Sequence, residues 1–245
     1  MTDSDERDHR FSEGQGFSDA YEEFDLDPPE LRVDPEKVDP VDSRVLTDLL
    51  DEHNVTRDDI DVESLIEVGL SYMGINRHEQ ATETFERAAR FAEEDSLLEQ
   101  EAWANKGVAH AELEEYDEAI GAYREALRIA ERSEHAAAAE TNLAYALWET
   151  GRTEQALEHA ERAVEIDNRF PQAWYNRGFF LLERGLAAEA VNCFDNAMRL
   201  GFRNAELLEE KARAHEELGE DERAEELAEE AEELRAESEQ QLLER

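Results

Sequence analysis

Lysine, cysteine and aromatic residues are all scarce in this chain of 245 residues. Only Lys37, Lys106 and Lys211 are lysines, the other basic residues being arginines, and Cys193 is the one cysteine. A single cysteine excludes an internal disulfide and a zinc site built from several thiolates. Aromatic residues make up 8% of the chain, which is little for the core of a compact enzyme. We therefore expect modest interfaces between small side chains instead of one large globular core.

Long apolar segments are also missing from the sequence. No stretch approaches the roughly 18 consecutive apolar residues that indicate a membrane-spanning helix, and residues 1–30 are polar and acidic. The sequence therefore predicts neither membrane insertion nor a signal peptide. A cytoplasmic location is the default expectation.

Basic residues are few relative to acidic ones, with 25 against 66 and a net charge of -41. A negative field of this size repels nucleic acid and anionic lipid, because binding to phosphates relies on clustered Lys and Arg. Two interpretations of the acidity stay open. Acid-rich, lysine-poor surfaces resemble those of extreme halophiles of the haloarchaeal type, since molar salt shortens the screening length to about 3 Å. Alternatively, the acidity serves an assembly or holding chaperone for a basic or unfolded client.

Sequence signatures of catalysis are absent. The chain has no Gly-rich phosphate loop, no His-Glu-x-x-His helix and no Gly-x-Ser-x-Gly elbow. The seven histidines, from His9 to His215, lack the spacing of metal ligands. Pairs of carboxylates carry no information in a chain this acidic. We expect no enzymatic activity, no cofactor and no metal site.

Proline is concentrated near the N-terminus, where residues 1–42 hold four of the five prolines. Their many acids and scattered apolar residues predict a disordered acidic tail. The tail either solubilises the chain or carries a short recognition motif that folds on binding. Residues 43–61 are expected to form a short helix and a link, because Ser43 can cap a helix with apolar residues at helical spacing.

From residue 62 onward the sequence repeats itself at intervals of 34 to 38 residues. Each repeat contains one small residue followed by two alanines at fixed distances. Small side chains at such sites let two antiparallel helices approach closely. We expect these packing sites to be Gly69, Ala81 and Ala88 in the first repeat, Gly107, Ala119 and Ala126 in the second, Ala144, Ala156 and Ala163 in the third, Gly178, Ala190 and Ala197 in the fourth, and Ala212, Ala224 and Ala231 in the fifth.

This arrangement resembles the tetratricopeptide repeat (TPR), whose unit of about 34 residues carries Trp, Leu-Gly, Tyr, Ala, Phe, Ala and Pro in this order. The fourth repeat fits best, with Trp174, Gly178 and Phe194 at the matching positions. The resemblance implies an all-α, right-handed solenoid of about five helix-turn-helix units. Their expected bounds are residues 62–95, 100–133, 137–170, 171–204 and 205–234. The wider spacing of the first three units predicts lengthened second helices there.

Two further features of the sequence lead to predictions: a basic residue that departs from the family pattern in three units, and a Glu-rich segment after the last repeat. In three units the residue before the small site is basic, namely Lys106, Arg177 and Lys211, where the family has an apolar residue. We expect their stems to lie along apolar surface with the charge in water. The Glu-rich sequence from Glu220 onward is predicted to form a long, charged capping helix that extends through residues 235–245.

In the TPR family the first helix of each unit lines a concave groove that binds a peptide or partner protein. The resemblance implies three amide side chains at one equivalent groove position, which either bond an extended peptide or bond within the solenoid. Aromatic side chains nearby could anchor a partner. Of these, Tyr145 and Phe179 could instead pack between first helices, which leaves Trp148 and Tyr175 as the stronger candidates. The candidate groove residues are Asn105, Asn142, Tyr145, Trp148, Tyr175, Asn176 and Phe179.

The sequence thus predicts a non-catalytic protein-protein interaction scaffold that binds its partner in the groove of units 2–4. Some family members bind acidic chain ends through Lys and Arg in the groove, and this sequence lacks that cluster. The fifth unit offers only Arg213 among several glutamates. The expected ligand is apolar or aromatic in the middle and neutral or basic towards unit five.

Overall fold

The computed structural model describes residues 60–133 and 135–243, with side chains described as far as residue 240. The chain divides after Ile60, and all the described residues except Ile60 belong to the second part, Asp61–Arg245. The predicted tail at residues 1–42 and the predicted helix that begins at Ser43 lie outside the described residues.

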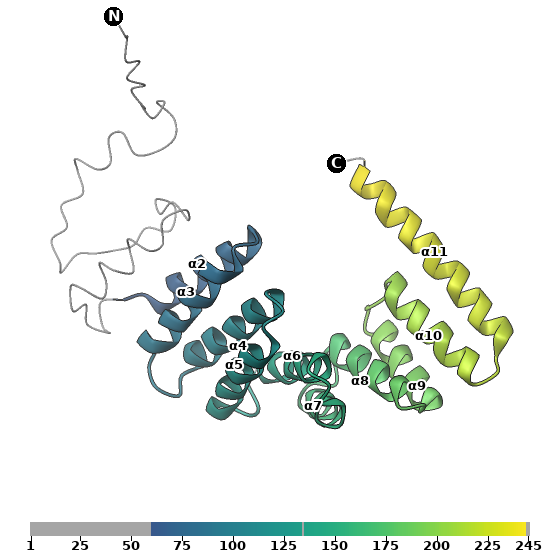
Figure 1. The fold of residues 1–245 in the computed structure, drawn as a ribbon, viewed down its shortest axis with the longest axis horizontal. Coiled ribbons are helices and arrows are strands. Elements are labelled where there is room, and N and C mark those ends of the chain that lie inside the picture. The colour runs from purple at the N-terminus through teal and green to yellow at the C-terminus, as the bar shows by residue number, and fades with distance from the viewer. Residues whose placement is uncertain (1–59, 134, 244–245) are drawn as a thin grey trace, which may run out of the picture. The chain divides into compact units, whose positions relative to one another are not determined.

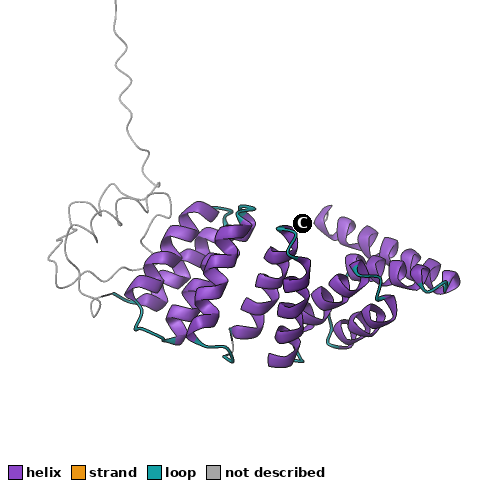
Figure 2. Cartoon of the chain, turned by 60° about the horizontal axis from the view of Figure 1, so that its bottom comes forward, coloured by secondary structure: helices purple, strands orange, loops and turns teal. Residues whose placement is uncertain are grey.

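The described residues form ten helices and no strand, and the helices pair into five units that follow one another along the chain (Figures 1 and 2). This confirms the predicted all-α solenoid of helix-turn-helix units. Unit 1 contains α2 (Val62–Gly74) and α3 (His78–Phe91), unit 2 α4 (Leu97–Glu112) and α5 (Tyr116–Ile129), unit 3 α6 (Ala136–Glu149) and α7 (Thr153–Ile166), unit 4 α8 (Pro171–Glu183) and α9 (Ala187–Arg199), and unit 5 α10 (Ala205–Glu217) and α11 (Asp221–Leu243).

The turn inside every unit has the same length and the same backbone conformation. Three residues separate the two helices of each pair. The middle residue always has a positive φ, a conformation that suits glycine because other residues clash there with their own Cβ. Units 3 to 5 place glycine at this position, whereas unit 2 places Glu114 there with a φ of 60°.

The extra length of the early units does not lie in their second helices, so that prediction was wrong. Helices α3, α5 and α7 have 14 residues each, against 13 in α9. The additional residues lie instead in α4, which has 16 residues, and in the connector 130–135 between α5 and α6. The spacing of alanines measures the length of a whole unit and cannot distinguish helix from connector.

The predicted small packing sites are all buried. Where the site is glycine, an aromatic ring of the second helix fills the space that a side chain would take. A Cβ added to the glycine would meet that ring at 2.4 Å for Gly69 and Phe85, 2.4 Å for Gly107 and Tyr123, and 2.8 Å for Gly178 and Phe194. Units 3 and 5 have alanine at both of the corresponding positions. Units 1, 2 and 4 therefore keep their two helices close by matching a glycine on the first helix with a large ring on the second.

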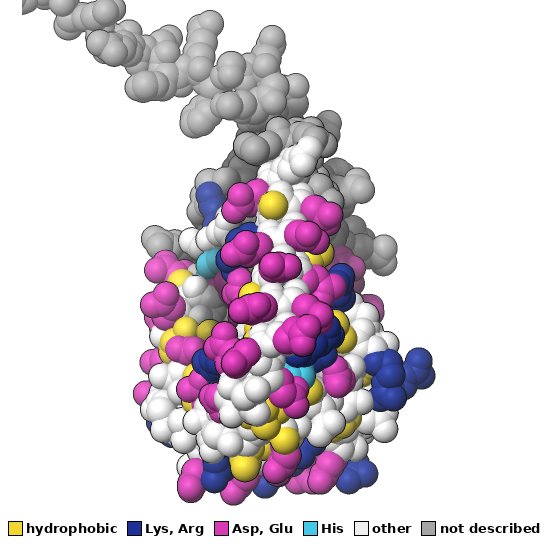
Figure 3. All heavy atoms as spheres, turned by 90° about the vertical axis from the view of Figure 1, so that its right-hand side faces the viewer, with side chains coloured by type: hydrophobic (Ala, Val, Ile, Leu, Met, Phe, Trp, Pro, Cys, Tyr) yellow, Lys and Arg dark blue, Asp and Glu magenta, His cyan; other side chains and the backbone are white. Residues whose placement is uncertain are grey.

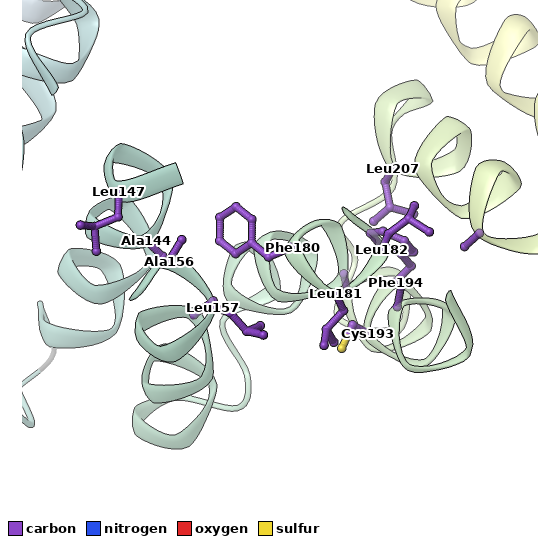
Figure 4. Close-up of a cluster of buried hydrophobic side chains, with 14 of the residues drawn as sticks. Ala144, Leu147, Ala156, Leu157, Phe180, Leu181, Leu182, Cys193, Phe194 and Leu207 are labelled. Carbon is purple, nitrogen blue, oxygen red and sulfur yellow. The ribbon is translucent and has the colours of Figure 1, made fainter. Parts of the chain in front are cut away.

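One cluster of buried apolar side chains extends from unit 2 to unit 5. In Figure 4, Phe180 of α8 lies beside the helices of unit 3, and Leu182 points towards Leu207 of α10. Cys193 is buried in the same cluster, and burial raises the pKa of its thiol to about 11. Its environment is that of an inert packing residue, because a reactive cysteine needs a lowered pKa.

The final helix α11 has 23 residues and covers α10 with a narrow apolar stripe. Ala224, Leu227 and Ala231 are buried in this stripe, while the rest of the helix is mainly exposed. Acidic side chains dominate the outer face that Figure 3 shows. The predicted long, charged C-terminal helix is thus confirmed as far as Leu243, and residues 244–245 lie outside the described residues.

At three of the four junctions, an ion pair joins the same two repeat positions of successive units, whereas units 2 and 3 are joined by a different pair, Arg152 and Asp117. The basic residue before each small site contacts an acid on the second helix of the preceding unit. The nitrogen-oxygen distances are 2.9 Å for Lys106 and Glu86, 3.4 Å for Arg177 and Glu161, and 2.5 Å for Lys211 and Asp195. The expectation that these charges lie in water alone is therefore corrected. Between units 2 and 3, the corresponding positions hold the buried Leu143 and the exposed Arg124, and no such pair forms.

Candidate functional site

A cavity of about 340 Å³ lies between the two helices of unit 2 and the first helix of unit 3. Its position follows from the repeat, because α4 and α6 present the same groove positions in neighbouring units. Val108 and Ala111 are small enough to leave room in front of the larger side chains. The lining residues are Val108, Ala111, Glu112, Glu114, Tyr116, Tyr123, Asn142 and Tyr145.

Three tyrosines dominate the aromatic part of this cavity. Tyr116 at the start of α5 meets Tyr145 of α6 edge to face, with ring centroids 6.2 Å apart. Tyr145 remains 44% exposed, whereas Tyr123 is buried. The cavity therefore combines an accessible ring with two rings held in place by packing.

Carboxylates stand close to these tyrosine hydroxyls. Burial raises the pKa of Tyr123, and the charge of Glu112 raises it further. Burial also raises the pKa of Tyr145, with Glu149 adding to the effect through its charge and a hydrogen bond. Both hydroxyls thus stay protonated near neutral pH. None of the lining side chains is basic.

The three candidate asparagines differ in their surroundings. Asn142 lines the cavity, and Asn105 lies half-buried on α4 outside it. Asn176 donates from Nδ2 to the backbone oxygen of Thr141 at 3.3 Å, across the junction of units 3 and 4. One amide therefore bonds within the solenoid, as one of the two interpretations expected, while Asn142 faces open space.

Trp148, one of the two stronger aromatic candidates, is engaged in packing. Its ring stacks on Phe180 at 5.2 Å between centroids and meets Phe179 edge to face at 5.3 Å. It is half-buried, whereas Tyr145 is exposed. The structure thus favours Tyr145 over Trp148 as an accessible anchor.

Tyr175, the other stronger candidate, also packs inside the solenoid. Its ring lies 5.3 Å from that of Phe202 and 6.1 Å from that of Phe194. Burial raises the pKa of Tyr175, and a hydrogen bond to Glu206 raises it further. Tyr175 therefore packs between α8 and the next unit, and little of its ring is free to contact a ligand.

The basic residue of unit 5 is held by the solenoid itself. Arg213 contacts Glu183 at 2.5 Å and Glu210 at 3.0 Å. Its guanidinium also lies 6.0 Å from the centre of the Phe179 ring. Burial raises the pKa of Glu210, although Arg213 acts in the opposite direction. Arg213 is thus engaged on three sides.

Sequence reasoning identified Asn142 and Tyr145 but missed the other residues that line the cavity. Tyr116 and Tyr123 belong to the second helix, which the groove pattern did not include. The useful signal was the small Val108 at the groove position that Tyr145 occupies one unit later. A small residue beside a large one indicates a gap, but only the packing of both helices shows that it stays open.

Two absences hold for residues 60–133 and 135–243. No three His, Cys, Asp or Glu side chains there gather into a group that could hold a metal ion. None of the helices in these ranges has the length and apolar character needed to cross a membrane.

Models of the tetratricopeptide repeat match residues 62–95 and 98–169. DnaJ homolog subfamily C member 7 of Mus musculus is 29% identical over 118 residues, which cover 48% of this chain but only 23% of that protein. Similar solved structures include MamA from Desulfovibrio magneticus, 16% identical with a TM-score of 0.59 over 72% of this chain and 96% of that one. PilF of Pseudomonas aeruginosa is 24% identical, with a TM-score of 0.61 over 71% and 78% of the two chains.

YrrB, described as a TPR protein with an unusual peptide-binding site, is 20% identical with a TM-score of 0.56 over 77% of this chain and 91% of that one. At these identities the solved structures establish the fold and nothing further. The matched segments lie in units 1 to 3, and units 4 and 5 continue the same geometry. Residues 62–95 and 98–169 therefore match tetratricopeptide repeats, and the described part of the chain folds as an all-helical TPR-like solenoid.

Proposed function

We propose that the chain is a non-catalytic protein-protein interaction scaffold whose first-helix surface on units 2–4 binds a peptide or a partner protein. The observation that carries this proposal is the cavity between α4, α5 and α6. It combines an exposed aromatic ring, Tyr145, with an amide, Asn142, on the same helix. Tyrosine anchors and a few polar groups are typical of recognition surfaces.

An extended segment suits this surface because amides at successive units can both donate to and accept from a peptide backbone. Asn105 and Asn142 occupy the same position of neighbouring first helices, and neither is tied to the backbone as Asn176 is. The engaged Arg213 leaves no ready site for an acidic chain end in unit 5.

Site-specific photo-crosslinking tests this proposal. A crosslinking amino acid replaces Tyr145 in one variant and Gln155, exposed on α7, in the control. Both variants are irradiated in extract of the native cells at native salt, and crosslinked peptides are identified by mass spectrometry. We expect position 145 to capture defined peptides that position 155 does not. Identical sets from both positions would contradict binding at the first-helix surface.

The acidic surface supports a second candidate, an assembly or holding chaperone for a basic or unfolded client. The net charge of -41 and the acidic face in Figure 3 favour this alternative. Charge-driven binding weakens in salt, whereas apolar contacts persist. Loss of the client at molar potassium chloride would favour the chaperone, and retention would favour the scaffold.

The same charge supports three narrower parts of the proposal. Nucleic acid and anionic membranes are unsuitable partners because both repel a strongly negative surface. The scarcity of lysine and the excess of acids fit a halophilic protein of the cytoplasm. A melting temperature that rises with potassium chloride up to molar concentration would support that setting, and a flat or falling dependence would count against it.

A further inference from the structure

We propose that the cavity between α4, α5 and α6 recognises a cationic side chain, an arginine or a lysine, carried by the bound segment. This inference rests on the proposed scaffold function and specifies the chemistry of its ligand. The sequence placed any basic part of the ligand near unit five. The structure assigns it to the junction of units 2 and 3 instead.

The first argument is the charge of the cavity. Glu112 and Glu114 line it, and Glu149 stands beside the hydroxyl of Tyr145. No lining residue offers a positive charge in return. An apolar side chain placed there would desolvate these carboxylates without compensating them, whereas a cation would pair with them. Charge complementarity therefore selects a basic side chain.

The second argument is the geometry of the rings. An ammonium or guanidinium group is attracted to an aromatic face within about 6 Å of its centre. Tyr116 and Tyr145 meet edge to face, so that the wall of the cavity contains both a ring face and a ring edge. With 44% of its surface exposed, Tyr145 can receive a side chain from solvent.

The third argument is a precedent inside the same molecule. At the junction of units 4 and 5, Arg213 lies over Phe179 and pairs with Glu183. In the repeat, Glu183 of unit 4 corresponds to Glu112 of unit 2, and Arg213 of unit 5 corresponds to Tyr145 of unit 3. At the cavity the chain thus keeps the acid of this pair but has a ring in place of its cation. The missing cation comes from the ligand.

A library of random peptides displayed on phage, selected against the full-length chain, tests the inference. We expect the enriched peptides to share an arginine or a lysine at one position. The best arginine peptide is then synthesised with citrulline, which keeps the shape and removes the charge. Its Kd, measured by fluorescence anisotropy, should rise about tenfold or more.

Variants of the chain locate the effect. Glu112→Gln and Tyr145→Ala should each weaken binding of the arginine peptide by about tenfold, and Glu112→Gln should leave the citrulline form unchanged. Glu118→Gln is the matched control, because it removes the same charge from an exposed position of α5 that does not line the cavity. It should change the Kd by less than about twofold. Equal weakening by Glu112→Gln and Glu118→Gln would overturn the inference, because it would show that the overall negative charge of the chain attracts the peptide.

The remaining outcomes separate this inference from the proposed function. Enriched peptides that lack basic residues but depend on Tyr145 would overturn the inference and leave the scaffold standing. Peptides that ignore Tyr145 altogether would contradict both. A photo-crosslink from position 145 to residues 1–59 of the same chain would make that segment the occupant and would overturn recognition of a partner's cation.

Discussion

The junction of units 2 and 3 differs from that of units 4 and 5 in how its polar groups are satisfied. In the later junction, Lys211 and Arg213 neutralise carboxylates of unit 4. In the earlier one, Arg152 pairs with Asp117, but Leu143 and Tyr145 stand at the positions of Lys211 and Arg213. Tyr145 there borders a cavity lined by Glu112 and Glu114 and by no basic residue. The same repeat thus forms two kinds of junction. In one, the chain supplies the cations that pair with the groove carboxylates, and in the other a ligand can supply one.

The largest effect we expect concerns a buried polar pair that unit 3 has and unit 5 lacks. His159 contacts Glu140 at 2.5 Å, and Glu140 is only 6% exposed. His159→Leu should lower the free energy of unfolding by about 3 kcal/mol, because it leaves a buried carboxylate unpaired. Urea titrations followed by circular dichroism measure this change.

The double variant Glu140→Leu with His159→Leu supplies the control for that experiment. It copies the pair at the same positions of unit 5, Leu208 and Leu227, both of which are fully buried. Its stability should return to within about 1 kcal/mol of the original chain. A double variant as unstable as the single one would mean that the loss comes from packing and not from the unpaired charge.

A smaller effect should distinguish the glycines on either side of the comparison. An added Cβ would meet Tyr123 at 2.4 Å in Gly107→Ala, but Phe194 at 2.8 Å in Gly178→Ala. We expect Gly107→Ala to cost about 2 kcal/mol and Gly178→Ala about 1 kcal/mol, since overpacking costs grow with the required displacement. The same urea titrations rank the two variants. Equal costs would show that the two units adjust equally well.

Removing the bridge at the later junction should have a modest effect. The Lys211 side chain is 7% exposed, so Lys211→Met should cost about 1 kcal/mol by leaving Asp195 without its partner. Arg235→Met is the matched control because Arg235 and Glu209 form an exposed pair, which contributes little. If both variants change the melting temperature equally, the repeated ion pairs do not stabilise the junctions specifically.

The smallest effect should be a gain in stability. Glu114 adopts a φ of 60° where units 3 to 5 have glycine. Glu114→Gly should raise the free energy of unfolding by about 1 kcal/mol or less, because relief of the left-handed strain exceeds the added freedom of the unfolded chain. It should also weaken binding of the arginine peptide, since Glu114 lines the cavity. A loss of stability would show that the left-handed backbone at Glu114 is not strained.

The sequence predicted the repeated framework well, because packing sites recur in register. Gly178 and Ala190 fixed the pairing of helices in unit 4, and their burial followed. The ion pair of Lys211 with Asp195 was missed, although the acid stands at the same distance after the first alanine as in the other paired units. The pattern relates residues within a helix, whereas this contact joins two units.

The candidate site was harder to predict because it depends on what each ring packs against. Trp148 and Tyr145 look equivalent in sequence as groove aromatics. Phe180 stacks on Trp148, whereas Tyr116 and Tyr145 meet edge to face and Tyr145 stays exposed. Exposure is thus decided by neighbours from other helices, which periodicity alone does not identify.

The constant three-residue turn has a consequence for how such a chain can change. Because every helix pair closes in the same way, units 1 to 4 differ in length mainly in α4 and in the connectors between pairs. A pair can therefore be exchanged as a cassette, and a connector such as residues 130–135 can be shortened without touching either helix of a pair. Ligand preference could then be reprogrammed by moving one cassette, with its rings and carboxylates, to another position in the series.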